Sequence, residues 1–210
     1  MKNFLAFLIV PIATVLFQLM YIDTVSQIIS CFVYLAVNRV FSLICYKSFN
    51  DRTISLNSSK ALIFALISVL TITDQLLKVI VHLNQASLDI IGKYFRIQIS
   101  KNTNQAAALN LFNIELDTAL IAAIKFFLIV IILLAFIKFK NKSNYLLYAF
   151  ILLLPAAIAN FIDSVVWGYT LDFFYFHRLV CYDLKDFYVD TAIGYLIITF
   201  LFASNKQTAD

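Results

Sequence analysis

Charged residues, glycine and proline are all scarce in this chain of 210 residues. Lys, Arg, Asp and Glu together make up 13% of it, well below the share of roughly a quarter that soluble domains show, and hydrophobic residues make up 62%. Such a chain lacks the polar side chains to cover a water-exposed surface, which excludes a soluble globular domain. Three Gly and two Pro also exclude collagen-like and disordered sequences. The sequence therefore predicts an integral membrane protein.

Cysteine is rare as well. Cys31, Cys45 and Cys181 are widely separated, and two of them lie inside apolar runs, so their spacing gives neither a disulfide framework nor a metal-binding motif. His177, Cys181 and Asp183 share one loop, but three mixed ligands without a second cluster do not make a convincing metal site. We expect no metal and no cofactor.

Six continuous apolar stretches are long enough to cross a bilayer as helices. Unbroken apolar runs also exclude an outer-membrane barrel, whose strands alternate in polarity. The sequence therefore predicts an all-α, six-helix polytopic bundle, with helices at about 4–22, 25–46, 61–82, 118–137, 145–163 and 188–203.

The net charge of +4 reports topology rather than nucleic-acid binding, because at least half of the basic residues flank apolar runs. Three lysines separate the fourth run from the fifth, and three basic residues separate the second from the third. By the positive-inside rule both connectors are cytoplasmic, and alternation places both termini there too. The segments 83–117 and 164–187 then face outward. The basic residues of the two connectors are Lys47, Arg52, Lys60, Lys138, Lys140 and Lys142.

The first outward segment contains a strand pattern. Phe95, Ile97 and Ile99 alternate with polar residues, which predicts a short strand with one apolar face, suited to the membrane surface. Residues 105–116 are rich in Ala and Leu and predict a short interfacial helix. We therefore expect a small extracytoplasmic segment containing a strand.

Acidic residues concentrate on the outward side. The chain has eleven Asp and one Glu, and carboxylates within or beside a membrane span are costly unless they have a function or a partner. Three different spans bring carboxylates to a similar depth, so these groups can converge on one site. The five residues concerned are Asp74, Asp163, Asp172, Asp186 and Asp190.

Two interpretations of these carboxylates remain open on physical grounds. Two neighbouring carboxylates in a poorly solvated place share one proton, so that one acts as base on a water while the other polarises a carbonyl. Alternatively they are helix caps and interfacial polar residues, and Asp186 fits that role at the start of the last span. Asp74 and Lys78 stand one turn apart and form either a structural clasp or a functional pair.

Four sequence blocks favour the first interpretation. In order, they resemble the signature blocks of the lipoprotein signal peptidase (signal peptidase II) family, which read approximately D-x-x-T-K, N-x-G-A-A-F, G-N-x-x-D-R with G-x-V-x-D-F, and F-N-x-A-D. Each block is weak alone, but four in order within a four-span topology are fairly specific. The corresponding segments here are Asp74-Gln75-Leu76-Leu77-Lys78, Asn104-Gln105-Ala106-Ala107-Ala108-Leu109, Ala159-Asn160-Phe161-Ile162-Asp163-Ser164 with Gly168-Tyr169-Thr170-Leu171-Asp172-Phe173, and Phe187-Tyr188-Val189-Asp190-Thr191-Ala192.

The resemblance covers roughly residues 61–204 as a four-helix membrane core. It leaves 1–60 as an N-terminal transmembrane hairpin with its cytoplasmic connector, and 205–210 as a cytoplasmic tail. It implies an intramembrane aspartyl endopeptidase that cleaves lipid-modified prolipoproteins before the diacylglyceryl-cysteine, at the outer face of the bacterial cytoplasmic membrane. The implied catalytic pair is Asp172 and Asp190, and the implied supporting residues are Asp74, Lys78, Asn104, Asn160 and Asp163.

Several positions depart from the family pattern. Ser164 stands where the pattern has Arg, Phe187 where it has Asn, and Ala159 where it has Gly, while Leu77, Ala106 and Leu109 replace a Thr, a Gly and a Phe. The lost Arg and Asn are polar groups near the implied pair, for which Arg178 or Lys185 can substitute. A non-catalytic membrane scaffold that binds lipoproteins, lipids or a membrane partner is therefore the alternative function, and a small transporter is a more distant third.

Two further features have open interpretations. Lys125, within the fourth span, points either into the same cavity or outward, and we expect it to snorkel outward. The loop 167–188 is dense in aromatic residues, which form either an interfacial belt, the expectation here, or a lid over a lipid-bearing substrate.

Overall fold

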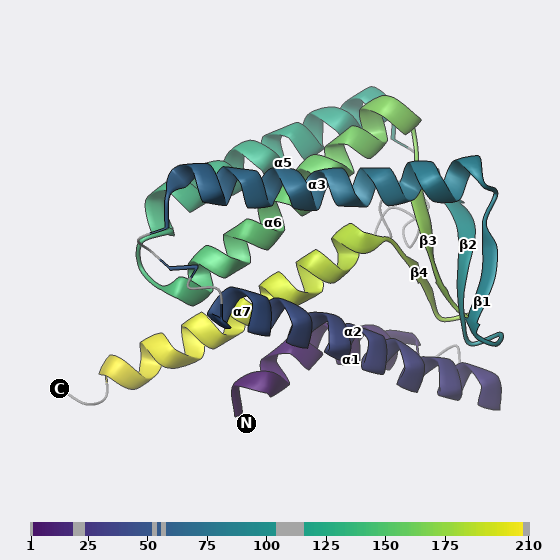
Figure 1. Cartoon of the computed structure of the whole chain (residues 1–210), viewed down its shortest axis with the longest axis horizontal. Helices are drawn as coiled ribbons and strands as arrows, with labels where there is room; N and C mark the ends of the chain where they lie inside the picture. The colour runs from purple at the N-terminus through teal and green to yellow at the C-terminus, as the bar shows by residue number, and fades with distance from the viewer. Residues whose placement is uncertain (1, 19–23, 52–53, 56–57, 104–115, 208–210) are drawn as a thin grey trace.

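The computed structural model describes residues 2–18, 24–51, 54–55, 58–103 and 116–207. These residues form a helical bundle with a small β-sheet at one end (Figure 1). The helical elements are η1 (Lys2–Leu8), α1 (Ile9–Gln18), α2 (Val25–Asp51), α3 (Lys60–Leu83), α5 (Thr118–Phe139), α6 (Asn144–Ile162), η3 (Asp163–Trp167) and α7 (Leu184–Gln207).

One α-helix lies in each of the six predicted apolar runs, so the predicted helix count is confirmed. Four helical stretches are long and apolar enough to cross a membrane: Val25–Phe49, Lys60–Leu83, Thr118–Phe139 and Asn144–Trp167. In the first run the described apolar helix covers Leu5–Gln18, and the rest of the predicted stretch, 19–22, lies outside the described residues. The last run belongs to the long helix α7, whose first turns carry charged residues.

Three of the membrane helices begin at a polar side chain that accepts a hydrogen bond from the first turn. Ser59 caps α3, Asp117 caps α5 and Ser143 caps α6. A cap oxygen satisfies one of the backbone N–H groups that a helix start leaves without a partner, which matters most where water is scarce. The apolar runs set the helix lengths, and these caps set where three of them start.

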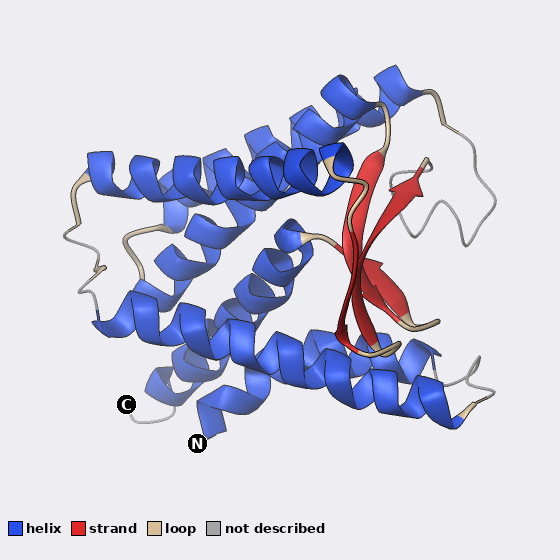
Figure 2. Ribbon diagram, turned by 45° about the vertical axis from the view of Figure 1, so that its right-hand side comes forward, coloured by secondary structure: helices blue, strands red, loops and turns tan. Residues whose placement is uncertain are grey.

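Both segments that were predicted to face outward contribute strands to one antiparallel sheet, in the order β1-β2-β3-β4. Its strands are β1 (Ser87–Ile91), β2 (Phe95–Asn102), β3 (Thr170–Phe176) and β4 (Val180–Tyr182). The predicted strand around Phe95 is confirmed as β2, while the other three strands were not expected. Strand β2 pairs with β3 across the two segments, with Ser100 opposite Asp172. Figure 2 shows the sheet standing across one end of the bundle.

Helix α6 is the centre of the bundle, and its side chains pack against α3, α5 and α7. It passes into the π-helical turn η3 and stops at Gly168, whose φ of 72° is left-handed and therefore suits a residue without a side chain. This stop turns the chain directly into β3. The residues that follow the fifth span are thereby placed against the start of α7.

The N-terminal hairpin packs closely against the rest of the chain. Phe7 of η1 lies so near Gly194 of α7 that a Cβ on the glycine would stand 2.3 Å from its ring. Tyr34 of α2 shares a buried cluster with Phe95 and Phe176 of the sheet. The hairpin therefore contacts both the bundle and the sheet.

Candidate functional site

Five buried charged side chains meet at the junction of α3, η3 and α7. The Nζ of Lys78 lies 2.9 Å from Asp74 Oδ2, 2.7 Å from Asp163 Oδ2 and 2.7 Å from Asp183 Oδ2. The Nζ of Lys185 contacts Asp183 and lies 3.2 Å from Asp163 Oδ2. We call these residues the ion cluster. Three carboxylates thus share two ammonium groups, so every charge has an ionic partner but the five residues together carry one excess negative charge.

Polar neighbours fix the geometry of the ion cluster. Gln75 Nε2 donates to Asp74 Oδ2 and to Asp163 Oδ1, at 3.1 Å each. Trp167 Nε1 donates in turn to Gln75 Oε1 at 3.4 Å. These hydrogen bonds hold the carboxylates of Asp74 and Asp163 in one orientation. Because Asp163 directly follows α6, they also join the end of α6 to α3.

The same carboxylates hold the start of α7. Asp74 Oδ1 accepts the backbone N–H of Lys185 at 3.0 Å, so a residue of α3 caps the first turn of a distant helix. Asp183 and Asp186 each accept the other's backbone N–H, at 3.3 and 3.0 Å, in a reciprocal capping box. The helix-capping interpretation of Asp186 is confirmed, and the Asp74–Lys78 pair has a structural role.

Asp172 and Asp190 line one cavity of about 400 Å³. Asp172 comes from β3 and is 7% exposed, and Asp190 lies two turns into α7 and is 4% exposed. Asn160, from the last turns of α6, lines the same cavity, as do Lys185 and Asp186. The structure therefore brings the two predicted carboxylates and one predicted supporting residue to a single polar cavity.

The surroundings of Asp172 favour its protonated form. Burial, helped by the nearby charge of Asp183, raises the pKa of Asp172 to about 7, although Lys185 and Lys78 oppose the shift. Burial alone would also raise the pKa of Asp183, but its contacts with Lys185 and Lys78 hold it below its ordinary value. The surroundings thus favour a neutral carboxyl at Asp172 and an ionised one at Asp183.

Asp172, Asp183 and Asp186 form an acidic cluster whose carboxylate oxygens lie within 4.8 Å of one another. Asp183 is already paired with Lys78 and Lys185. One of its three carboxylates therefore has lysine counter-ions within the same site.

The other predicted residues have mixed outcomes. Asp74, Lys78 and Asp163 all belong to the ion cluster, while Asn104 and most of the expected helix at 105–116 lie outside the described residues. The expectation that Lys125 snorkels outward is wrong. It is 7% exposed and lies within electrostatic reach of Asp163, since the ion cluster draws the ammonium group inward.

Sequence reasoning missed three contributors to the site. Asp183 was considered only as a metal ligand, Lys185 only as a possible substitute for the missing Arg, and Gln75 not at all. For Asp183 a usable signal existed, because an acidic residue three positions before Asp186 at the start of an apolar run is typical of a capping box.

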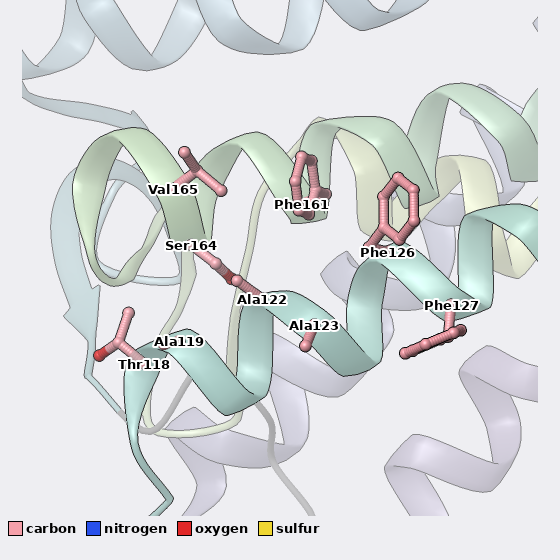
Figure 3. A pocket seen from close by; sticks show the side chains of 9 residues that line it. All are labelled: Thr118, Ala119, Ala122, Ala123, Phe126, Phe127, Phe161, Ser164 and Val165. Atoms are coloured by element: carbon pink, nitrogen blue, oxygen red, sulfur yellow. The ribbon is translucent and has the colours of Figure 1, made fainter.

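A second pocket, of about 510 Å³, lies between the first turns of α5 and the end of α6 (Figure 3). Its lining is almost entirely apolar. Ser164, which stands at the position of the pattern's Arg, points toward Ala122 of α5 in this pocket. Phe161 also lines it and directly follows Asn160, so the apolar pocket and the polar cavity share one turn of α6.

Two solved structures share the fold. One is described as a bacterial membrane enzyme structure obtained by the in meso method at 2.3 Å resolution. It has a TM-score of 0.58 and 22% sequence identity, covering 71% of this chain and 93% of the other. A second, at 1.9 Å resolution, has a TM-score of 0.57 and 21% identity, covering 69% of this chain and 95% of the other.

Sequence comparison identifies the family. A lipoprotein signal peptidase of Caldicellulosiruptor bescii is 36% identical over 81 residues, which cover 37% of this chain and 53% of that protein. The chain thus matches about half the length of this relative. The family model of signal peptidase (SPase) II matches residues 66–202, more than half of the chain. With its apolar helices and this match, the chain is an integral membrane protein that belongs to the signal peptidase II family.

Proposed function

We propose that this protein is an intramembrane aspartyl endopeptidase that cleaves lipid-modified prolipoproteins before the diacylglyceryl-cysteine. The observation that carries the proposal is the shared cavity of Asp172 and Asp190. Both carboxyl groups are buried, and they come from separate elements that the ion cluster and the sheet hold in place. The family match supports the same reaction.

The surroundings of the two residues suggest their roles. Asp172, which lies beside the ionised carboxylate of Asp183, is the acid that donates a proton to the carbonyl oxygen of the scissile peptide. Asp190 is the base that takes a proton from the attacking water. The resulting diol collapses when the C–N bond breaks. The leaving amine then takes the proton from Asp190, and Asp172 regains its own from a diol hydroxyl.

The remaining residues serve binding and support. Asn160 can hydrogen-bond the peptide backbone of a substrate in the cavity. Asp74, Lys78 and Asp163 hold α3, α6 and α7 together around the cavity, and Asn104 belongs to the same supporting set by its motif. The apolar pocket beside Asn160 suits a hydrocarbon part of the substrate, because it offers almost no polar group.

We further propose an orientation with the site at the outer face of the bacterial cytoplasmic membrane and both termini in the cytoplasm. The two connectors rich in basic residues lie at the end of the bundle opposite the sheet (Figure 1). This arrangement supports the positive-inside assignment, because the site is then placed at the outer boundary. The N-terminal hairpin 1–60, the core 61–204 and the tail 205–210 remain the proposed division of the chain.

The test is cleavage of a lipid-modified precursor peptide by the full chain in detergent micelles. Asp172→Asn and Asp190→Asn should each abolish cleavage, because each removes one half of the acid–base pair. Asp89→Asn is the matched control, since Asp89 is exposed and pairs with Arg96 on the sheet. Normal turnover by either of the first two variants would overturn the mechanism.

The alternative is a non-catalytic scaffold of the same fold. It is favoured by Phe187, which stands where the pattern has Asn and packs into an aromatic cluster with Phe41, Phe174 and Tyr182, at centroid distances of 5.4 to 5.5 Å. If this alternative holds, the wild-type chain binds the lipid-modified precursor without cleaving it.

A further inference from the structure

We infer that Tyr34, a residue of the N-terminal hairpin, is a positioning residue that holds the Asp190 carboxyl together with Tyr182. The inference deepens the proposed function and rests on it. Tyr34 lies in α2, outside the residues 66–202 that the family model matches. The hairpin would then complete the catalytic site.

Tyr34 is fully buried at the contact between the hairpin and the sheet. Its ring meets the ring of Phe176 edge-on at 5.2 Å and that of Tyr182 edge-on at 5.4 Å. These contacts orient the ring, so the position of its hydroxyl is defined by packing from two strands. A tyrosine held so closely has little freedom to turn its hydroxyl away from Tyr182.

A chain of hydroxyl groups leads from the hairpin to Asp190. The Oη atoms of Tyr34 and Tyr182 lie 2.7 Å apart. Tyr182 lines the same cavity as Asp190, both hydroxyls are near enough to act on the Asp190 carboxyl, and Thr14 of α1 acts in the same way on Tyr34. Both helices of the hairpin, α1 and α2, therefore contribute a hydroxyl group to the chain that leads to Asp190, the proposed base.

The two tyrosines orient the Asp190 carboxyl without using all of it. Asp190 Oδ2 is buried and has no hydrogen-bond partner among the described residues. In our proposal the tyrosine hydroxyls hold the other oxygen, Oδ1. A carboxylate with one oxygen anchored keeps the other at a fixed place. That arrangement suits a base whose second oxygen must receive a proton from water.

The hydroxyl of Tyr34 is not needed to dock α2. Ser42 Oγ and Thr191 Oγ1, which lie 3.1 Å apart, already join α2 to α7 next to Asp190. Phe41 also packs on Phe187 and Tyr188, at centroid distances of 5.4 and 5.9 Å. Tyr34→Phe should therefore keep the fold, so that the effect of the hydroxyl can be measured separately.

The first experiment measures kcat and KM for cleavage of a lipid-modified precursor peptide by the full chain. Tyr34→Phe and Tyr182→Phe should each lower kcat by about tenfold or more, the usual loss for a hydrogen bond to a charged group, with KM nearly unchanged. The matched control is Tyr195→Phe, since Tyr195 is equally buried and its hydroxyl has no partner among the described residues. An unchanged kcat in Tyr34→Phe would overturn the inference.

The second experiment does not depend on activity. Infrared difference spectra between the wild type and Asp190→Asn isolate the carboxyl band of Asp190. In a Tyr34→Phe background this band should shift, because a hydrogen bond to the carboxyl is lost, whereas Tyr195→Phe should leave it in place. An unshifted band overturns the inference even if the enzyme is active. Conversely, a wild type that cleaves nothing refutes the proposed function, and the band still decides whether Tyr34 holds Asp190.

Discussion

The Nζ of Lys78 lies 2.7 Å from Oδ2 of Asp183, which joins the last turns of α3 to the residue that caps α7. Neither side chain is exposed. Because Asp190 lies two turns along α7, this contact also sets where the proposed base stands relative to Asp172. The ion cluster therefore helps to fix the position of Asp190 by holding the start of α7.

Lys78→Met should destabilise the fold by about 3–5 kcal/mol, because it leaves the carboxylates of Asp74, Asp163 and Asp183 with a single ammonium group. The matched control is Arg96→Met. Arg96 Nε lies 2.6 Å from Asp89, but the two side chains are 34% and 53% exposed, so its loss should cost about 0–1 kcal/mol. Chemical unfolding in detergent micelles measures both, and equal losses would show that the cluster is not a buried clasp.

Stability should fall as the pH rises through neutrality, on account of Asp172. Its pKa in the folded protein is about 7, above the ordinary value of 3.8, so the folded state keeps a proton that the unfolded chain releases. The resulting stabilisation is complete below about pH 4 and is lost as the pH passes through 7. Between pH 5 and 8 the melting temperature of the wild type should therefore fall more than that of Asp172→Asn, which cannot titrate there. Parallel curves would contradict the raised pKa.

Much of the fold could be predicted because membrane spans depend on composition. Continuous apolar runs must become helices in lipid, where each backbone N–H and C=O needs an internal partner. The alternation around Phe95 likewise predicted β2. The sheet as a whole was not predictable, since β3 has an unbroken aromatic run, Phe173-Phe174-Tyr175-Phe176, without alternation, and pairs with β2 only because both segments lie at the same end.

The site was predictable only in part. Topology predicted that several carboxylates gather on one side of the bundle, and only the resemblance to the family's sequence blocks singled out Asp172 and Asp190 among them. The pairing of Lys185 with Asp163 and Asp183 depends on how the start of α7 packs against the end of α6. The spacing of residues along the sequence does not predict that packing. For the same reason, the contact between Tyr34 and Tyr182 could not be foreseen.

Gly194→Ala tests whether the hairpin is an integral part of the bundle. A Cβ at this position would stand 2.3 Å from Phe7 Cδ1 and 3.0 Å from Phe7 Cα, so η1 must move and not only its side chain. We expect a loss of about 1–3 kcal/mol in unfolding free energy. Phe7→Ala removes the ring contact, so adding Gly194→Ala to that variant should cost clearly less. An equal cost in both backgrounds would show that η1 does not pack against Gly194.

The hydroxyl pair of Ser42 and Thr191 offers a quantitative test of how the hairpin is held beside Asp190. The two oxygens lie 3.1 Å apart and both side chains are buried, so removing one leaves the other without this partner. Ser42→Ala and Thr191→Val should each destabilise the protein, and a double-mutant cycle should give a coupling of about 1 kcal/mol.

The matched control for that cycle pairs Ser42→Ala with Thr199→Val, since the Thr199 hydroxyl donates to the backbone of its own helix, at Tyr195 O. This second cycle should show no coupling, because the two residues share no contact through their hydroxyls. A coupling near zero for Ser42 and Thr191 would mean that apolar packing alone holds α2 against α7.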